Sequence, residues 1–279
     1  GDHRDLHSFP TRRSSDLKLW DLLSLTSGAG CRAAFSVSSD KAVSPANLMG
    51  ASKRLMEQVL LADHGPLIGK TTTARFANVA FSQGSLLAGF LSRIEQGQPL
   101  AGPSDVTRYF ISPDEAAQLC LLSAAAGGGG EIFVPRRSEI LRPMKFTDIA
   151  RAVLAEHGCE PAWYEDPAAA RAAMADDMAA GRYPCCFGPS RTAGEKACEV
   201  FVGPAEVVDS MRLKAIDVVV GTPLVDRGVL AQFVEDVRRW SGGCGPGGWP
   251  DKAAIIERIA LLAPELDHLD LPMTLDQTM

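Results

Sequence analysis

The chain has 279 residues, and its 28 Lys and Arg against 34 Asp and Glu give a formal net charge of −6. Binding to nucleic-acid backbones requires a basic surface, and this chain has a net negative charge, so we expect no nucleic-acid partner. No run approaches the roughly 20 consecutive apolar residues that cross a bilayer, and the 46% hydrophobic content is that of a globular chain, which favours small-molecule chemistry.

Residues 1–17, GDHRDLHSFPTRRSSDL, show neither a helical nor a strand periodicity. They mix charges, His, Pro and Ser, as disordered tails do. The part HSFPTRRSSDL resembles the translation of a sequencing-library adapter. We therefore expect residues 1–17 to be a disordered, non-native leader.

Turn residues separate the next segments, which alternate between helical and strand patterns. Residues 19–25 predict the end of a helix that Gly28 and Gly30 stop. The uncharged run 33–38 predicts a strand covered on both faces, and residues 71–76 predict the next strand. Between them, apolar positions three to four residues apart predict an amphipathic helix: Leu48, Ala51, Leu55 and Val59. This βαβ order predicts a parallel sheet flanked by helices.

The later elements are spaced less regularly. The sequence predicts helices at residues 86–96, 113–125, 146–157 and 167–180, and extended segments at 107–111 and 131–135. Beyond Gly181, clusters of Pro and Gly such as GGCGPGGWP (242–250) predict long loops and one helix at residues 230–240.

The seven cysteines include no C-x-x-C pair, the spacing that zinc sites usually show. Their density is also far below that of a secreted disulfide scaffold. We expect reduced, buried thiols and no metal site.

Side chains that can transfer protons gather after the first predicted strand. Ser39, Asp40 and Lys41 follow the run 33–38 directly. Ligands in open α/β sheets bind beyond the carboxyl ends of the strands, so this position is suited to acid and base groups. Met49 and Lys53 lie on the next predicted helix, where a spacing of four residues places them on one face. Isolated charges are usually only solvated, but this combination indicates a candidate site.

The segment SVSSDKAVSPANLMGASKR (36–54) resembles the catalytic segment of the UDP-N-acetylglucosamine 4,6-dehydratases and their relatives. These are extended short-chain dehydrogenase/reductases of the polysaccharide-biosynthesis type, with the pattern S-[ST]-D-K-A followed by N-x-[YM]-G-[AS]-[ST]-K. Further segments match the family in the same order, over about residues 19–202: ARFANV (74–79), TRYF (107–110), GEIFVPR (130–136) and AGEKACEVFV (193–202).

The resemblance implies an α/β fold, with a partial Rossmann-like parallel sheet, flanking helices and a smaller α/β substrate domain. Residues 18–82 would be the carboxyl-terminal part of an NAD-binding Rossmann domain that carries the catalytic segment. Residues 83–202 would be mainly substrate-binding, and residues 203–279 would be a carboxyl-terminal extension without an assigned role.

The resemblance also implies roles for individual residues in a dehydration that uses NAD or NADP. Lys41 would be the base that removes the C5 proton of a UDP-sugar, and Asp40 the acid that protonates the C6 hydroxyl. Ser39 would bond the C4 oxygen, and Lys53 would hold the nicotinamide ribose. Ser38 and Met49, together with Ser39, would line the cofactor.

Contacts to the sugar nucleotide are implied for Asn78, Val79 and Arg108. A guanidinium such as that of Arg108 can pair with phosphate through two hydrogen bonds, although a salt bridge to a carboxylate is the alternative interpretation. Arg75 within ARFANV is interpreted as either a site residue or a structural one.

Two positions depart from the family pattern. Met49 replaces the usual Tyr, and a thioether cannot donate or accept the proton that a phenol would transfer. Longer, membrane-anchored family members carry Met at the same position, so Met49 resembles a subfamily feature. Ala77 stands where the family usually has Gly.

A dinucleotide site needs a Gly-rich turn between a strand and a helix, and the sequence has no such turn after a predicted strand. We therefore expect a fragment that lacks the cofactor loop, from a cytoplasmic enzyme that can form homo-oligomers. Any membrane anchoring would come only from a missing amino-terminal part. A sugar-nucleotide epimerase or reductase of the same superfamily and a non-catalytic fragment remain the alternatives.

Overall fold

The computed structural model describes residues 15–27, 29–62, 69–137, 141–190, 198–241 and 250–267. They form two compact units. The first contains the described residues of 1–76, 117–136 and 200–270, and the second those of 77–116 and 137–199. Each unit is therefore assembled from separate stretches of the chain, whereas each domain expected from the sequence was one continuous stretch.

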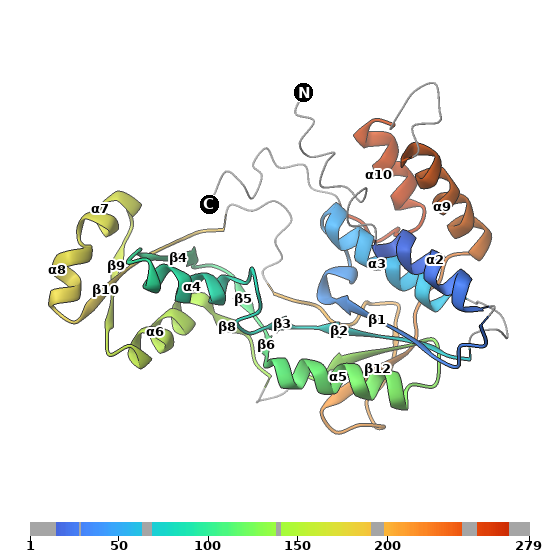
Figure 1. Ribbon diagram of the computed structural model, residues 1–279, viewed down its shortest axis with the longest axis horizontal. Helices are drawn as coiled ribbons and strands as arrows, with labels where there is room; N and C mark the ends of the chain where they lie inside the picture. The colour runs from blue at the N-terminus through green and yellow to red at the C-terminus, as the bar shows by residue number, and fades with distance from the viewer. Residues whose placement is uncertain are drawn as a thin grey trace. The chain divides into compact units, whose positions relative to one another are not determined.

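A five-stranded sheet forms the centre of the first unit (Figure 1). Its strands, in spatial order, are β1 (Ala34–Ser39), β2 (Thr71–Phe76), β7 (Glu131–Pro135), β12 (Ile216–Gly221) and β11 (Val207–Asp209). The first three are parallel, as predicted, but β12 pairs antiparallel with β7 and with β11. The parallel part that the βαβ order predicted is confirmed, and the antiparallel strands β11 and β12 were not predicted. The short connection 210–215 explains why β11 and β12 are antiparallel, because parallel neighbours need a long crossover.

The helical segments of this unit agree with the predictions up to residue 126. They are α2 (Ser15–Ser27), the 3-10 turn η1 (Asp40–Ala42), α3 (Leu48–Leu61), α5 (Pro113–Ala126), α9 (Arg227–Ser241) and α10 (Lys252–Ala260). Helix α2 begins inside the expected leader, whose residues 1–14 lie outside the described part. Helix α9 confirms the helix expected at 230–240, whereas α10 was not predicted.

Helices α3 and α5 cover opposite faces of the sheet (Figure 1). Side chains alternate along strand β2, so neighbouring residues of this strand contact different helices. Ala74 points to one face, where it packs with Leu119 of α5 and with Phe133 and Val218. Arg75 points to the other face and reaches α3. The βαβ interpretation of residues 33–76 is therefore confirmed.

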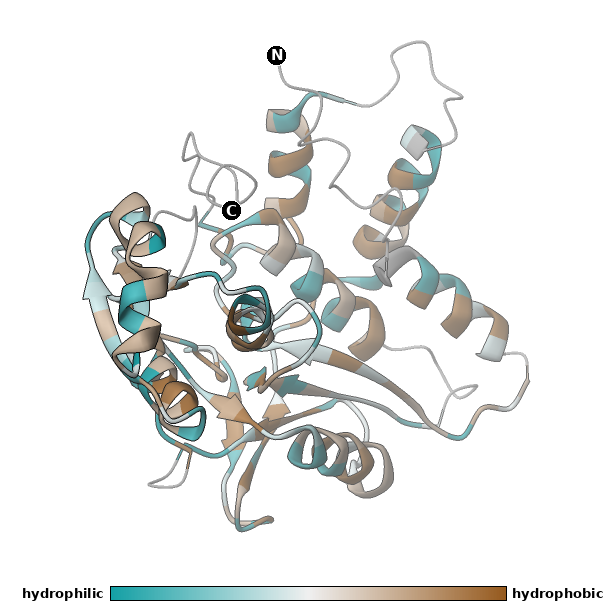
Figure 2. Ribbon diagram, turned by 60° about the vertical axis from the view of Figure 1, so that its left-hand side comes forward, coloured by the Kyte–Doolittle hydropathy of each residue, from teal (hydrophilic) through white to brown (hydrophobic). Residues whose placement is uncertain are grey.

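A three-stranded parallel sheet organises the second unit, in the order β4 (Leu100–Pro103), β10 (Arg182–Gly188) and β9 (Glu160–Tyr164). Two short strand pairs are β3 (Asn78–Val79) with β6 (Phe110–Ile111), and β5 (Thr107–Arg108) with β8 (Met144–Lys145). The helices are α4 (Leu86–Glu95), α6 (Phe146–Glu156), α7 (Pro167–Ala172) and α8 (Met174–Ala179). They carry both hydrophobic and hydrophilic residues (Figure 2), as expected of helices with one buried face.

The core of the second unit joins the sheet to α4 and α6. Phe90, Leu100, Leu154 and Cys185 are completely buried in it. Burial raises the pKa of the Cys185 thiol to about 12. The six described cysteines are free thiols, but only Cys185 is buried, so the expectation of buried thiols is confirmed for Cys185 alone.

Two predictions about this unit are wrong. The helix expected at 167–180 is two helices, because the backbone of Ala173 has ψ −6 and tightens the turn between them. Beyond Gly181 the structure has strand β10 where the sequence predicted a loop, even though Pro184 lies inside it. Pro is rare in a central strand because it cannot donate a ladder hydrogen bond, so local sequence rules disfavour β10.

Candidate functional site

The predicted acid and base lie on the turn that follows strand β1. Ser39 caps the 3-10 turn η1, and its Oγ accepts a hydrogen bond from Lys41 N at 3.3 Å. The side chain of Asp40 is only 9% exposed and that of Lys41 is 49% exposed, with Lys41 Nζ 3.4 Å from Asp40 Oδ1. The structure therefore brings a buried carboxylate and a partly exposed amine together at the carboxyl end of a strand.

The start of helix α3 packs directly against this turn. Asn47 caps α3 by accepting a hydrogen bond from Gly50 N at 2.9 Å. A Cβ atom at Gly50 would lie 2.5 Å from Lys41 O, so only glycine permits this close approach. Met49 is 57% exposed, and Lys53 is partly exposed one turn further along α3.

Ser38 differs in its surroundings from the residues that follow it. It is 2% exposed, and its Oγ donates a hydrogen bond to Glu57 Oε1 at 2.6 Å. The hydroxyl predicted to line a cofactor is thus bound inside the protein. Its acceptor, Glu57, is completely buried on α3.

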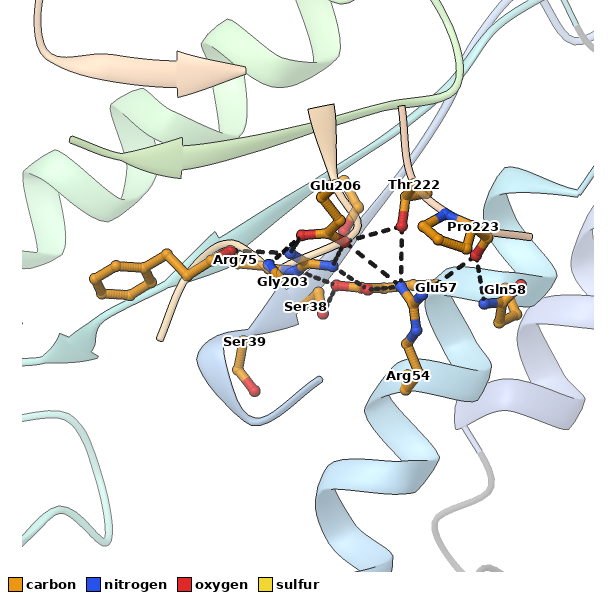
Figure 3. A network of polar contacts seen from close by, with 12 residues as sticks. Ser38, Ser39, Arg54, Glu57, Gln58, Arg75, Gly203, Glu206, Thr222 and Pro223 are labelled. Carbon is orange, nitrogen blue, oxygen red and sulfur yellow. Dashed lines mark hydrogen bonds and ion pairs between the residues drawn. The ribbon is translucent and has the colours of Figure 1, made fainter. Parts of the chain in front are cut away.

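Glu57 belongs to a buried polar network that sequence reasoning missed (Figure 3). Arg75 donates through Nε and Nη2 to the two oxygens of Glu57, both at 2.8 Å. It also donates through both Nη atoms to Glu206 at 2.7 Å, and through Nη1 to Phe201 O at 2.9 Å. All five N–H groups of the guanidinium are used, so Arg75 has the structural role that the sequence left open.

Arg54 connects the same carboxylates to the later part of the chain. Its Nη1 lies 3.3 Å from Glu57 Oε2 and 3.7 Å from Glu206 Oε1. The same nitrogen donates to Thr222 Oγ1 at 3.2 Å, and Thr222 donates in turn to Glu206 at 2.9 Å. A sequence signal for this network exists: Glu57 and the polar Gln58 stand within the otherwise apolar stretch LMEQVLL of α3.

Electrostatics keep Arg75 and Glu206 charged despite their burial. Burial opposes the charge on Arg75, but the attraction of Glu57 and the hydrogen bonds that Arg75 donates to Glu57 and Glu206 outweigh it and raise the pKa of Arg75. Burial likewise opposes the charge on Glu206, and the hydrogen bonds and attraction of Arg75 lower the pKa of Glu206 below its ordinary value.

The second unit brings together two of the predicted sugar-nucleotide residues. Asn78 Nδ2 donates hydrogen bonds to Glu199 Oε1 and to Tyr109 O. Arg108 Nε lies 3.6 Å from the same Glu199 oxygen, and Glu199 Oε2 accepts from Tyr109 N at 3.1 Å. Val79 follows Asn78 in β3. Glu199 was not predicted as a site residue, although it lies in the family-like segment AGEKACEVFV.

These observations define the class of the protein. The first unit is a Rossmann-like α/β sheet with acid and base groups at a strand end, and the second is a smaller α/β unit. The family model described as polysaccharide biosynthesis protein matches residues 21–219, which is more than half of the chain. The chain belongs to this family.

Curated relatives share the family and cover part of the chain. The capsular polysaccharide biosynthesis protein CapD of Staphylococcus aureus is 38% identical over 120 residues, 42% of this chain and 20% of that protein. A UDP-N-acetylglucosamine 4,6-dehydratase (inverting) of Campylobacter jejuni is 32% identical over 129 residues, 44% of this chain and 37% of that protein. The chain therefore aligns with only a fifth to about a third of the length of these relatives.

A solved structure confirms the fold class. The chain superposes on a dTDP-glucose 4,6-dehydratase from Streptomyces venezuelae, with NAD bound, at a TM-score of 0.52 and 17% identity. The match covers 87% of this chain and 72% of that one. In the described part of this chain, no helix has the length and apolar character to span a membrane.

Proposed function

We propose that this chain carries the acid and base groups of a nucleotide-sugar 4,6-dehydratase that acts in polysaccharide biosynthesis. One observation carries the proposal: a buried Asp40 and a half-exposed Lys41 whose charged atoms are 3.4 Å apart on the turn after β1. Two groups of opposite proton-transfer roles, held side by side, suit a reaction that removes one proton and donates another.

Each residue of the turn has a defined task in this reaction. Lys41 Nζ takes the C5 proton of a 4-keto sugar, and the electron pair of the C5–H bond moves into the ketone as an enolate. Asp40 donates its proton to the C6 hydroxyl, which leaves as water. Ser39 holds the C4 oxygen through its hydroxyl. A bound NAD or NADP supplies the hydride transfer at C4 and C6.

The residues near the nicotinamide end of such a cofactor fit this proposal. Met49 and Lys53 lie one turn apart on α3 and neither is buried, so Lys53 would be available to hold the ribose hydroxyls of the nicotinamide nucleotide. The sequence offers no Gly-rich loop for the pyrophosphate, and we assign no residue of this chain to that part. Residues 18–82 supply the cofactor-facing groups in this proposal.

Asn78, Val79 and Arg108 are the proposed contacts to the UDP-sugar. Glu199 accepts a hydrogen bond from Asn78 and lies 3.6 Å from Arg108 Nε, which is the salt bridge that the sequence left as the alternative for Arg108. Binding of the nucleotide would therefore have to displace Glu199 from these two side chains. We place the enzyme in the cytoplasm, where nucleotide sugars are made, with a UDP-N-acetylhexosamine as the substrate.

An epimerase is the second candidate, because the same superfamily contains UDP-sugar 4-epimerases. Met49 argues against it, since a C4 epimerase relies on the tyrosine proton carrier that Met49 replaces. An epimerase at C4 also has no use for a base directed at C5. The Asp40 and Lys41 pair therefore favours the dehydratase.

Exchange of the C5 hydrogen tests the proposal in the 279-residue chain itself. The chain is incubated in D2O with a UDP-4-keto-6-deoxy-N-acetylhexosamine, and loss of the C5 proton signal is followed by NMR. This half-reaction needs the base and the sugar contacts but no hydride transfer. We expect exchange well above the buffer rate, and UDP-N-acetylglucosamine binding in a calorimetric titration.

Two lysine variants make the test specific. Lys41→Ala should reduce exchange to the buffer rate, whereas Lys214→Ala, at an exposed lysine outside the candidate site, should leave it unchanged. Exchange that survives in Lys41→Ala would reject Lys41 as the base. Binding without exchange in the wild-type chain would favour the epimerase, and absence of both would favour a non-catalytic fragment.

A further inference from the structure

We propose that Glu57 is a positioning residue for the acid and base turn, and that the segment Phe201–Pro223 is coupled to this turn through Glu57. The inference rests on the proposed function of Asp40 and Lys41. It assigns a role to part of the region after residue 203, for which the sequence suggested none.

The contact between Glu57 and the turn is direct. Ser38 Oγ donates to Glu57 Oε1 at 2.6 Å, and Ser38 immediately precedes Ser39, which caps the 3-10 turn. Ser38 and Glu57 are 2% and 0% exposed, so water does not compete for this hydrogen bond. The bond fixes the end of strand β1 against helix α3 one residue before the reacting groups begin.

The orientation of Glu57 is itself fixed from two sides (Figure 3). Arg75 binds both of its carboxylate oxygens at 2.8 Å, and Arg54 approaches Oε2 at 3.3 Å. A carboxylate held by two hydrogen bonds of one planar guanidinium cannot rotate freely. Glu57 therefore presents a fixed acceptor to Ser38.

The same guanidinium extends the network into the later segment. Arg75 binds Glu206 with two hydrogen bonds of 2.7 Å, and Gly203 N donates to Glu206 Oε2 at 2.7 Å. Thr222 Oγ1 donates to Glu206 Oε1 at 2.9 Å. Figure 3 shows these groups in one continuous chain of dashed contacts that starts at Ser38 and ends at Pro223.

Buried opposite charges couple the members of the network. The side chains of Arg54, Glu57, Arg75 and Glu206 are at most 4% exposed. Arg54 also pairs at 3.3 Å with Glu265, whose side chain is 34% exposed. A shift of one member would leave a buried charge without its partner, which is unfavourable. Movement at Glu206 is therefore transmitted to Glu57 and to the hydroxyl of Ser38.

Two mild substitutions test this coupling without removing a buried charge. Ser38→Ala deletes the hydroxyl next to the turn, and Thr222→Val replaces the far hydroxyl with a group of the same shape. Matched controls come from the other face of the sheet: Ser123→Ala removes a buried hydroxyl that donates to Thr73 O at 3.1 Å, and Thr72→Val one that donates to Ser123 O at 3.1 Å.

The rate of C5 exchange at saturating UDP-4-keto-6-deoxy sugar and the affinity for that sugar are measured separately. We expect Ser38→Ala to slow exchange by about 10- to 100-fold with unchanged affinity, as small displacements of catalytic groups do. Thr222→Val should slow it in the same direction, and the two control variants should not. Equal rates for Ser38→Ala and Ser123→Ala would overturn the proposal, because a general loss of stability would affect both.

A second readout needs neither ligand nor activity. Backbone amide signals of Asp40 and Lys41 should shift in Ser38→Ala and in Thr222→Val, and should stay in place in Ser123→Ala. If the amide signals shift in both variants while the wild-type chain shows no C5 exchange, the dehydratase function is rejected and the coupling is kept. Unshifted amide signals in both test variants would reject the coupling, whatever the activity.

Discussion

The substitution Arg75→Lys isolates the geometry of the buried network from its charge. Lys keeps the positive charge but offers at most three donors, where the guanidinium of Arg75 makes five hydrogen bonds of 2.7 to 2.9 Å. At least two bonds to buried carboxylates or to Phe201 O are then lost. Arg75 and Glu57 are 0% exposed, so water does not replace them.

The expected loss of stability follows from these bonds. A hydrogen bond that involves a charged group contributes about 1.5 to 3 kcal/mol, so the loss of two such bonds in Arg75→Lys should lower the free energy of unfolding by about 3 to 6 kcal/mol. This is a large share of the roughly 5 to 15 kcal/mol that stabilises an ordinary domain.

The free energy of unfolding is measured by urea denaturation, with circular dichroism as the signal. Hydrogen exchange of the β2 amides then shows whether the loss of stability lies in the first unit. Arg239→Lys is the matched control, because Arg239 is 60% exposed and has an ion pair of 3.6 Å with Asp236. It should change the free energy by less than about 0.5 kcal/mol. A loss below about 1 kcal/mol in Arg75→Lys would refute the reasoning, since that is less than one hydrogen bond to a charged group contributes.

Two further predictions concern the turn and the pH. Gly50→Ala should destabilise the chain by about 1 to 3 kcal/mol in the same denaturation assay, because its Cβ would meet Lys41 O at 2.5 Å. Gly89→Ala on helix α4 should be neutral or stabilising, because no atom beyond its own helix lies within 4 Å of an added Cβ there. Equal stability of the two variants would contradict the steric argument. Because the pKa of Glu206 is lowered from 4.5 in the folded chain, its contribution is present above that pH and is lost as the pH falls through the folded value. Urea midpoints should therefore decline as the pH falls below the ordinary Glu value of 4.5, and Glu206→Gln should weaken this decline; parallel pH curves for variant and wild type would exclude Glu206 as a source.

The sequence anticipated the elements that have strong local signals. The uncharged run before Ser39 became strand β1, and the apolar spacing around Leu55 became helix α3. The antiparallel strands β11 and β12 were missed, as was β10 with its Pro184. Pairing partners far away in the chain decide whether such segments form strands, and local propensity does not contain that information.

For the candidate site, the sequence likewise indicated the residues that carry a local signal. The pattern of Ser39, Asp40 and Lys41 was visible because the three residues are adjacent, and the structure places them on one capped turn. Their roles, like those of Lys53, Asn78 and Val79, stay predictions until the exchange assay is done.

Sequence alone determined that this chain is an α/β protein with proton-transfer groups at the end of its first strand, because periodicity and adjacency are local properties. Only the tertiary structure decided what surrounds them. Glu57, Arg75 and Glu206 are far apart in sequence, and Glu199 lies about 120 residues from Asn78. Buried charges must find partners wherever the fold supplies them, so the network that holds the turn was defined by the packing of distant segments.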